Sequence, residues 1–188
     1  NTTGINFFIG KLISMSSLGI YERTFKIMTL PGTYLGNILD KVMFPSMARF
    51  NDNDIKLYSY YKKGLTFVNA IMFPATLLLI LFSREIVYII LGKTWLSTVL
   101  SLRILFLCLL FRVAIRMCDS VIRAKGLVYK SAKNKFINAL ILAVLVYIGH
   151  FWDVNGICIA MAVFSLISYR SMSVLVQKSF NKTLGEVV

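Results

Sequence analysis

Residues 64–83 read GLTFVNAIMFPATLLLILFS and contain no Asp, Glu, Lys or Arg. Lys62 and Lys63 precede this stretch and Arg84 follows it. A helix needs about 20 predominantly apolar residues to cross the hydrocarbon core of a bilayer, so the stretch predicts a membrane helix. Pro74 lies inside it. Membrane helices tolerate proline because neighbouring groups satisfy the freed carbonyl, so we expect a kink there and not a break.

The whole chain is strongly apolar. Of its 188 residues, 57% are hydrophobic and 15% are charged, and the mean hydropathy is +0.73. An ordinary soluble domain is roughly 45–50% apolar and about 25% charged. The composition therefore excludes an ordinary soluble domain, intrinsic disorder, and collagen-like or disulfide-framed folds.

Further apolar segments predict an all-α fold, a polytopic transmembrane helix bundle with about six membrane helices. The expected membrane helices cover residues 5–18, 22–48, 64–83, 95–124, 134–151 and 154–177, with an interfacial helix over 52–62. The last two membrane helices form a hairpin around the turn WDVNG. We expect residues 1–188 to form a single transmembrane lobe. Because the first residue is Asn1 and not Met, we also expect the chain to be a piece of a longer protein.

The chain is basic, with 21 Lys and Arg against 8 Asp and Glu and a formal net charge of +13. In a soluble protein this excess would indicate nucleic-acid binding. In a helical membrane protein, however, basic residues concentrate in cytoplasmic loops and beside anionic headgroups. We therefore expect membrane lipids as partners, and no nucleic acid.

The basic loop residues fall into two unequal groups when six helices alternate across the membrane. The larger group comprises Arg49, Lys56, Lys62, Lys63, Arg123, Lys125, Lys130, Lys133, Lys135, Lys178 and Lys182. The smaller group, on the opposite side, comprises Arg23, Lys26, Arg84 and Lys93. Since basic loops are retained on the cytoplasmic side, this separation supports the six-helix count and predicts a cytoplasmic carboxyl terminus.

Four charged residues, Arg112, Arg116, Asp119 and Arg123, lie on one stripe of the predicted helix 95–124 because of their i, i+4, i+7 and i+11 spacing. A charge at the bilayer centre costs about 2.5–3.5 kcal/mol on insertion scales, so such residues face a bundle interior or a water-filled cavity. A guanidinium suits phosphate because its planar fork donates two parallel hydrogen bonds and remains charged. The stripe thus indicates a phosphate-binding cavity, with Arg112, nearest the middle of the helix, as its best candidate.

A structural role is the alternative for the same stripe. Arg123 and Arg116 can extend to the cytoplasmic interface, and Asp119 can neutralise either arginine. Lys11 and Asp40 are further ionisable residues in apolar segments, and each either lines the cavity or lies at an interface near its helix end. The candidate substrate-binding residues are therefore Arg112, Arg116, Asp119, Arg123 and Lys11.

The usual constellations for catalysis and metal binding are absent from the sequence. It has no HExxH, no GxSxG and no Walker-type glycine loop, and it contains a single histidine. Cys108, Cys118 and Cys158 lie in apolar surroundings without CxxC spacing, which predicts small core residues and no metal site or disulfide. We expect no catalytic residues, no metal and no cofactor, and hence a protein that is not an enzyme.

Three segments resemble, in order and spacing, the carboxyl-terminal half of bacterial polysaccharide flippases. They are IGKLISMSSLGIYERTFKIMTLPG at 9–32, VMFPSMARFNDN at 42–53 and FPATLLLILFSREIVYIILGKTW at 73–95. The matching positions are Ile9, Gly10, Lys11, Leu18, Gly19, Tyr21 and Arg23, then Phe44, Pro45, Ser46 and Arg49, then Phe73, Pro74, Glu85, Val87, Leu91, Gly92 and Trp95. The family is the polysaccharide-transporter branch of the multidrug/oligosaccharidyl-lipid/polysaccharide exporter superfamily. The resemblance covers most of residues 5–126, and the last two helices agree in hydropathy only.

The resemblance implies a transporter with two lobes of about six helices around a central cavity, of which this chain is one lobe. Such a protein moves an undecaprenyl-pyrophosphate-linked oligosaccharide to the outer leaflet by alternating access, for O-antigen, capsule or exopolysaccharide synthesis. Similar proteins line the cavity with Arg and Lys that face the pyrophosphate, in agreement with the stripe around Arg112. The implied partners are the lipid-linked oligosaccharide, membrane lipids and an amino-terminal lobe of the same protein, in the bacterial cytoplasmic (inner) membrane.

Two other functions fit parts of the pattern. One is a multidrug exporter of the same superfamily, which would not depend on a lipid-linked sugar. The other is a polytopic glycan polymerase or transferase of the same pathway, since such enzymes are also basic, many-helix proteins. An enzyme of that kind needs a large extramembrane loop, and the longest polar stretch here covers only residues 50–63.

Overall fold

The computed structural model describes residues 15–49 and 53–185, and these residues form helices and connecting turns without a strand. The expected all-α fold is thereby confirmed. The elements are α2 (Met15–Ala48), α3 (Asp54–Leu81), α4 (Ser83–Ile90), the 3-10 helix η1 (Lys93–Thr98), α5 (Val99–Ala124), α6 (Val128–Gly149), the 3-10 helix η2 (His150–Trp152) and α7 (Asp153–Gly185).

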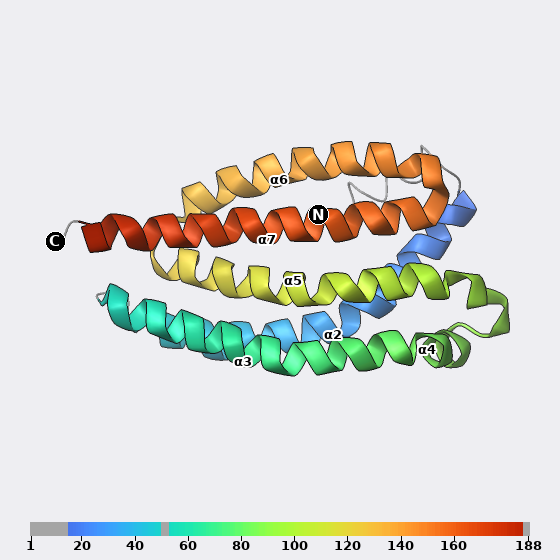
Figure 1. Ribbon diagram of the computed structural model, residues 1–188, viewed down its shortest axis with the longest axis horizontal. Coiled ribbons are helices and arrows are strands. Elements are labelled where there is room, and N and C mark those ends of the chain that lie inside the picture. Colours follow the sequence, from blue (N-terminus) through green and yellow to red (C-terminus); the bar gives the residue numbers. More distant parts are fainter. Residues whose placement is uncertain (1–14, 50–52, 186–188) are drawn as a thin grey trace.

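The long helices lie side by side and alternate in direction (Figure 1). Helix α5 packs against α2, α3 and α7, and α6 packs against α7. At one end of the bundle α3 and α6 begin and α5 and α7 end; we call it the Lys125 end, after the residue that follows α5. At the opposite end, the Gly149 end, α6 is followed by α7. This arrangement makes α5 the central helix, enclosed by its neighbours.

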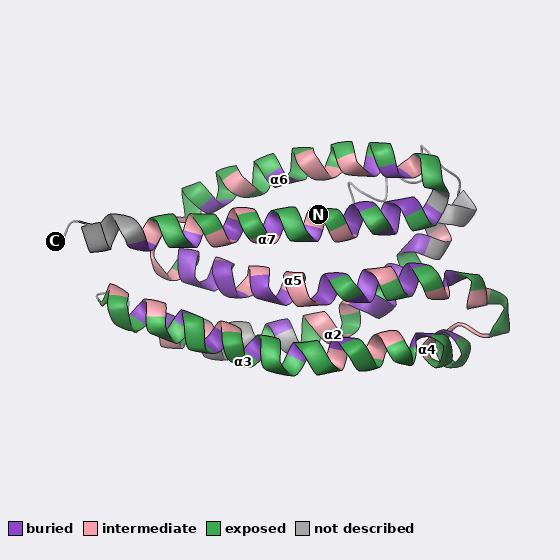
Figure 2. Ribbon diagram, viewed as in Figure 1, coloured by how far each residue is buried: buried purple, intermediate pink, exposed green. Residues whose placement is uncertain are grey.

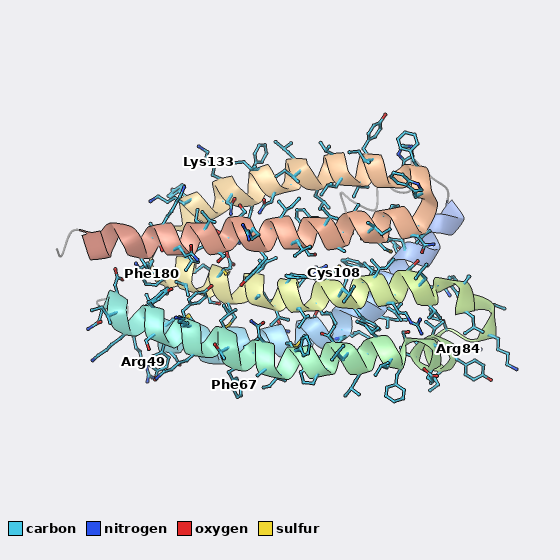
Figure 3. The ribbon with its side chains drawn as sticks, viewed as in Figure 1. Arg49, Phe67, Arg84, Cys108, Lys133 and Phe180 are labelled. Atoms are coloured by element: carbon cyan, nitrogen blue, oxygen red, sulfur yellow. The ribbon has the colours of Figure 1, made fainter. Side chains whose placement is uncertain are left out.

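Among the described helices, α5 contributes the largest share of the core, with buried residues along its length (Figure 2). Cys108 and Cys118 on α5 and Cys158 on α7 are buried free thiols, which confirms their predicted place in the core. Figure 3 shows Cys108 within the bundle, whereas Phe67 projects outwards from α3 and is 64% exposed. The core is therefore central, and the outer helices turn apolar side chains away from it.

This exposed apolar surface fits a lipid environment, because contiguous apolar surface of this extent is unfavourable in water. Among the residues described, four helical segments are long and apolar enough to cross a membrane. They are Asp54–Leu81, Lys93–Ala124, Val128–Trp152 and Val154–Phe180. The chain is a multi-pass membrane protein. Helix α2, which carries five charged residues, is not among the four, and most of the predicted helix 5–18 lies outside the described residues.

Two helix boundaries differ from those expected. The interfacial helix 52–62 and the membrane helix 64–83 form one uninterrupted helix, α3, which continues through Pro74. Asn53 caps it by accepting a hydrogen bond at Oδ1 from the backbone N–H of Lys56 at 3.0 Å. The break expected at residues 19–21 is also absent, because α2 is helical from Met15 and buries Tyr21 against Phe25, with ring centroids 5.4 Å apart. A buried side chain lies close to each junction, Tyr21 on α2 and Tyr61 on α3, and its packing in the core favours a continuous helix.

Helix α5 is followed by a tight turn at Gly126. Gly126 has a φ of 68°, the left-handed conformation that glycine adopts without strain. The Leu127 N–H donates to Ile122 O, and the Gly126 N–H donates to Arg123 O, both at 3.0 Å. This is the hydrogen-bond pattern of a Schellman cap, which turns the chain from α5 into α6.

Candidate functional site

A cavity of about 420 Å³ lies between helices α2, α5, α6 and α7 and is the candidate functional site. This volume falls within the range of small-molecule sites. Its walls are formed by Phe25 of α2, Arg112, Ile115 and Arg116 of α5, Lys135, Asn138, Ala139 and Leu142 of α6, and Met161, Phe164, Ser165, Ser168 and Met172 of α7. Three cationic side chains thus share one cavity with hydroxyl groups and a large apolar surface.

The charged stripe predicted on α5 divides into two parts. Arg112 and Arg116 line the cavity, whereas Asp119 and Arg123, one and two turns further on, are not among its lining residues. All four lie on one side of α5, as the spacing required, but different helices meet the stripe at different levels. Their roles in substrate binding remain predictions. Lys11 lies outside the described residues, as does the side chain of Asp40.

The two cavity arginines are positioned by α2. The Arg112 guanidinium carbon lies 5.1 Å from the centroid of the Phe25 ring, a cation–π geometry, and among the described residues no carboxylate forms an ion pair with Arg112. Arg116 donates from Nη1 to Asn37 Oδ1 at 3.5 Å. It also passes close to Gly36, where any Cβ would overlap the guanidinium. A glycine on α2 therefore makes room for an arginine on α5.

Asp119 belongs to a polar cluster next to the cavity. Its Oδ1 accepts a hydrogen bond from Ser131 Oγ at 3.1 Å and lies 2.7 Å from Lys135 Nζ, while its Oδ2 lies 3.5 Å from Arg123 Nε. The carboxylate thus joins the end of α5 to the beginning of α6. The structure places Asp119 and Arg123 in the charge-neutralising arrangement that was the structural alternative for this stripe. Lys135 belongs to both the cluster and the cavity wall.

Neutral polar residues connect α6 with α7 along the cavity. Asn138 Nδ2 donates to Ser168 Oγ at 3.3 Å, and Ser165 Oγ donates to the backbone oxygen of Met161 at 2.8 Å. One turn before Asn138, Asn134 accepts a hydrogen bond at Oδ1 from Ser171 Oγ at 2.5 Å. These contacts hold α6 against α7, because polar groups inside a membrane bundle form hydrogen bonds with neighbouring helices.

From the sequence, Lys135 is expected in a loop, and Asn138, Ser165 and Ser168 are not among the predicted site residues. A signal for these residues exists in the sequence. Asn138 interrupts the apolar segment 136–149, and Ser165 and Ser168 are three residues apart in another apolar segment. Polar residues inside membrane helices usually face the bundle interior.

These features define a polytopic helical membrane protein with a cation-lined cavity between its helices. Residues 1–100 match the model of a family described as "Polysaccharide biosynthesis protein", and the chain belongs to this family. No solved structure gives a significant match.

The chain is also similar to three curated bacterial proteins. The chain is 25% identical over 166 residues to an "Uncharacterized membrane protein in cps region" of Klebsiella pneumoniae (86% of this chain, 34% of the relative). It is 27% identical over 169 residues to the "Lipopolysaccharide biosynthesis protein WzxC" of Escherichia coli (strain K12) (89% and 34%). It is 27% identical over 129 residues to the "Teichuronic acid biosynthesis protein TuaB" of Bacillus subtilis (strain 168) (67% and 27%). The chain thus spans about a third or less of the length of these relatives.

Proposed function

We propose that this chain is one lobe of a transporter that moves a lipid-linked oligosaccharide across the bacterial cytoplasmic membrane for surface polysaccharide synthesis. The observation that carries the proposal is the cavity, where Arg112, Arg116 and Lys135 face the same space as an apolar wall and two serine hydroxyls. An undecaprenyl-pyrophosphate-linked oligosaccharide has the matching parts, namely an anionic diphosphate, a hydroxylated sugar and an apolar chain. The family and its relatives support this substrate class.

The residues have distinct roles in this proposal. Arg112 and Arg116 bind the diphosphate, since a guanidinium forms paired, charge-assisted hydrogen bonds with phosphate oxygens. Phe25 and Asn37 hold these guanidinium groups in place from α2 before the substrate arrives. Such preorganisation reduces the side-chain conformational entropy that is lost on binding. The protein binds and moves its substrate without breaking a covalent bond, which makes it a transporter and not an enzyme.

We also propose how the helix bundle is oriented in the membrane. The Lys125 end carries most basic loop residues and therefore faces the cytoplasm, together with the carboxyl end of α7. Arg112 and Arg116 lie in the half of α5 nearer this end. A substrate made at the cytoplasmic face then meets the arginines early in its passage. A second lobe of the same protein completes the path.

The test is complementation of a strain that lacks the transporter and cannot display its polysaccharide, with the lipid-linked intermediate measured in each leaflet. The full-length protein should restore display. Arg112→Ala should reduce transfer to the outer leaflet about tenfold, because charge-assisted hydrogen bonds contribute about 1.5–3 kcal/mol. The intermediate should then accumulate in the cytoplasmic leaflet.

The matched control is Arg84→Ala, which removes an exposed arginine on α4 at the Gly149 end (Figure 3). It should transport normally at equal protein level. Unchanged transport by Arg112→Ala would remove this arginine from the substrate path. If the intermediate reached the outer leaflet without the protein and only chain extension failed, a polymerase would replace the transporter as the function.

A further inference from the structure

Asn138 on α6 is a buried amide in the cavity wall whose hydrogen-bonding capacity is only partly used. The residue is 5% exposed, and its Nδ2 donates to Ser168 Oγ. Its Oδ1 is sealed from solvent and has no hydrogen-bond partner among the described residues. A buried acceptor without a partner costs free energy, so proteins rarely retain one without a use for it. The location in the cavity wall indicates that the missing partner is part of a ligand.

That partner must be a hydrogen-bond donor. Ionised phosphate oxygens only accept, so the diphosphate cannot satisfy Asn138 Oδ1, whereas a sugar hydroxyl both donates and accepts. Lys135, one turn earlier on α6, is a donor already engaged by Asp119 at 2.7 Å. The amide is therefore chemically matched to the sugar and not to the phosphates.

The neighbouring hydroxyl groups on α7 are also suited to binding the sugar. Ser165 and Ser168 lie one turn apart and line the cavity beside Asn138. The Ser165 hydroxyl donates within its own helix, which leaves its oxygen able to accept. A sugar that presents several hydroxyls can thus donate to the serine and asparagine oxygens together.

We propose that Asn138, with Ser165 and Ser168, forms a subsite for a hydroxyl of the sugar attached to the diphosphate. This inference rests on the proposed function and adds selectivity to it, because it favours the sugar-loaded carrier over the bare lipid diphosphate. Lys135 and Asn138 are three residues apart, a rise of about 4.5 Å, so the cationic and neutral groups of α6 are adjacent. In a sugar bonded to a phosphate, the nearest ring hydroxyls lie at a similar distance from the phosphate group.

Access to the oxygen requires one local movement. Asn138 already forms part of the cavity wall, and we expect rotation of its amide to turn Oδ1 towards the ligand. That rotation breaks the hydrogen bond to Ser168 Oγ, which at 3.3 Å is long. A hydroxyl that then bonds both Asn138 and Ser168 replaces the lost contact.

The experiment compares two probes on the purified full-length protein: undecaprenyl diphosphate, and undecaprenyl diphosphate that bears one glucose. The unmodified protein should bind the glucosylated probe about fivefold more tightly, as expected for one net hydrogen bond. Asn138→Leu, which has similar volume, should reduce the ratio of the two affinities to about one. Its affinity for the bare diphosphate should change less than twofold. Asn138→Ala is the second variant if the leucine impairs folding.

Asn134→Leu is the matched control, since it removes the same residue type one turn away, where Ser171 and Met172 already engage the amide. It should lower stability and leave the affinity ratio near fivefold. No preference for the glucosylated probe in the unmodified protein, or an unchanged ratio in both Asn138 variants, would overturn the sugar subsite. Failure of the proposed function is distinct: the bare diphosphate would then bind equally well after Arg112→Ala.

Discussion

The two ends of the bundle are held together by different chemistry. At the Lys125 end, Lys125 Nζ lies 2.9 Å from Asp54 Oδ1, 3.1 Å from Ser179 O and 4.0 Å from the centroid of the Phe180 ring. One ammonium group thus joins the beginning of α3 to the ends of α5 and α7. The ion pairs of Asp119 join α5 to α6 at the same end.

The contacts at the Gly149 end include close backbone packing and hydrogen bonds in which at most one partner is charged. Gly149 of α6 and Gly156 of α7 face each other so closely that a Cβ on either would overlap the backbone of the other. Ser101 Oγ donates to Asn155 Oδ1 at 2.7 Å, and Arg103 Nε donates to Ser83 Oγ at 2.8 Å. Helices can therefore be joined by ion pairs where basic loops meet water, and by small residues where they cross tightly.

The largest expected effect is at the glycine crossing. Gly156→Val should destabilise the protein by about 3 kcal/mol or more, because the new side chain meets the Gly149 backbone, which cannot move aside like a flexible side chain. A Cβ there would also lie 2.7 Å from Trp152 Cβ. The measurement is the temperature at which the detergent-solubilised protein loses its monodisperse peak.

Gly19→Ala is the matched control, since a Cβ at Gly19 meets nothing within 4 Å. Alanine also favours a helix by about 1 kcal/mol over glycine. This variant should be as stable as the unmodified protein or slightly more so. Equal stability of Gly156→Val and Gly19→Ala would contradict the close backbone crossing at Gly149 and Gly156.

The Lys125 end should be less sensitive, because its ion pair keeps partial access to solvent and a substitution there introduces no backbone overlap. Asp54 and Lys125 side chains are 15% and 10% exposed, so removing one partner leaves a mostly buried charge. Asp54→Asn or Lys125→Met alone should cost about 2 kcal/mol. The double variant should cost less than the sum of the two, by about 1 kcal/mol, in a double-mutant cycle.

The cycle separates the ion pair from other roles of the same residues. Asp54 lies in the first turn of α3, where a carboxylate also favours the helix dipole, and Lys125 contacts the Phe180 ring independently. Additive effects would mean that these separate contacts, and not the pair, stabilise this end.

The sequence predicted the fold better than the site, for a physical reason. Length, apolar content and Gly126 define the helices, because crossing a bilayer and ending a helix are local requirements. The spacing of Arg112, Arg116, Asp119 and Arg123 likewise defines one side of α5. It does not determine which helix packs against each turn of that side, and this packing separates the cavity arginines from the paired Asp119. The contribution of Lys135 and Asn138 depends on α6, whose position relative to α5 is a tertiary property.

The smallest effect on stability is expected at Asp119, where the Lys125 end adjoins the cavity through Lys135. Lys135 and Arg123 side chains are 55% and 41% exposed, so the loss of both ion pairs in Asp119→Asn should cost only about 1 kcal/mol. The asparagine retains an oxygen that accepts a hydrogen bond from Ser131.

The same substitution, Asp119→Asn, should strengthen substrate binding although it weakens stability. With the carboxylate gone, Lys135 is released to the cavity that it lines, and the affinity for undecaprenyl diphosphate should rise about twofold to threefold at low salt and less at high salt. Asp54→Asn removes a carboxylate at the same end that does not line the cavity, so it should leave this affinity unchanged. If both variants raised the affinity equally, the effect would come from the net charge of the Lys125 end, and the coupling of Asp119 to the cavity through Lys135 would be wrong.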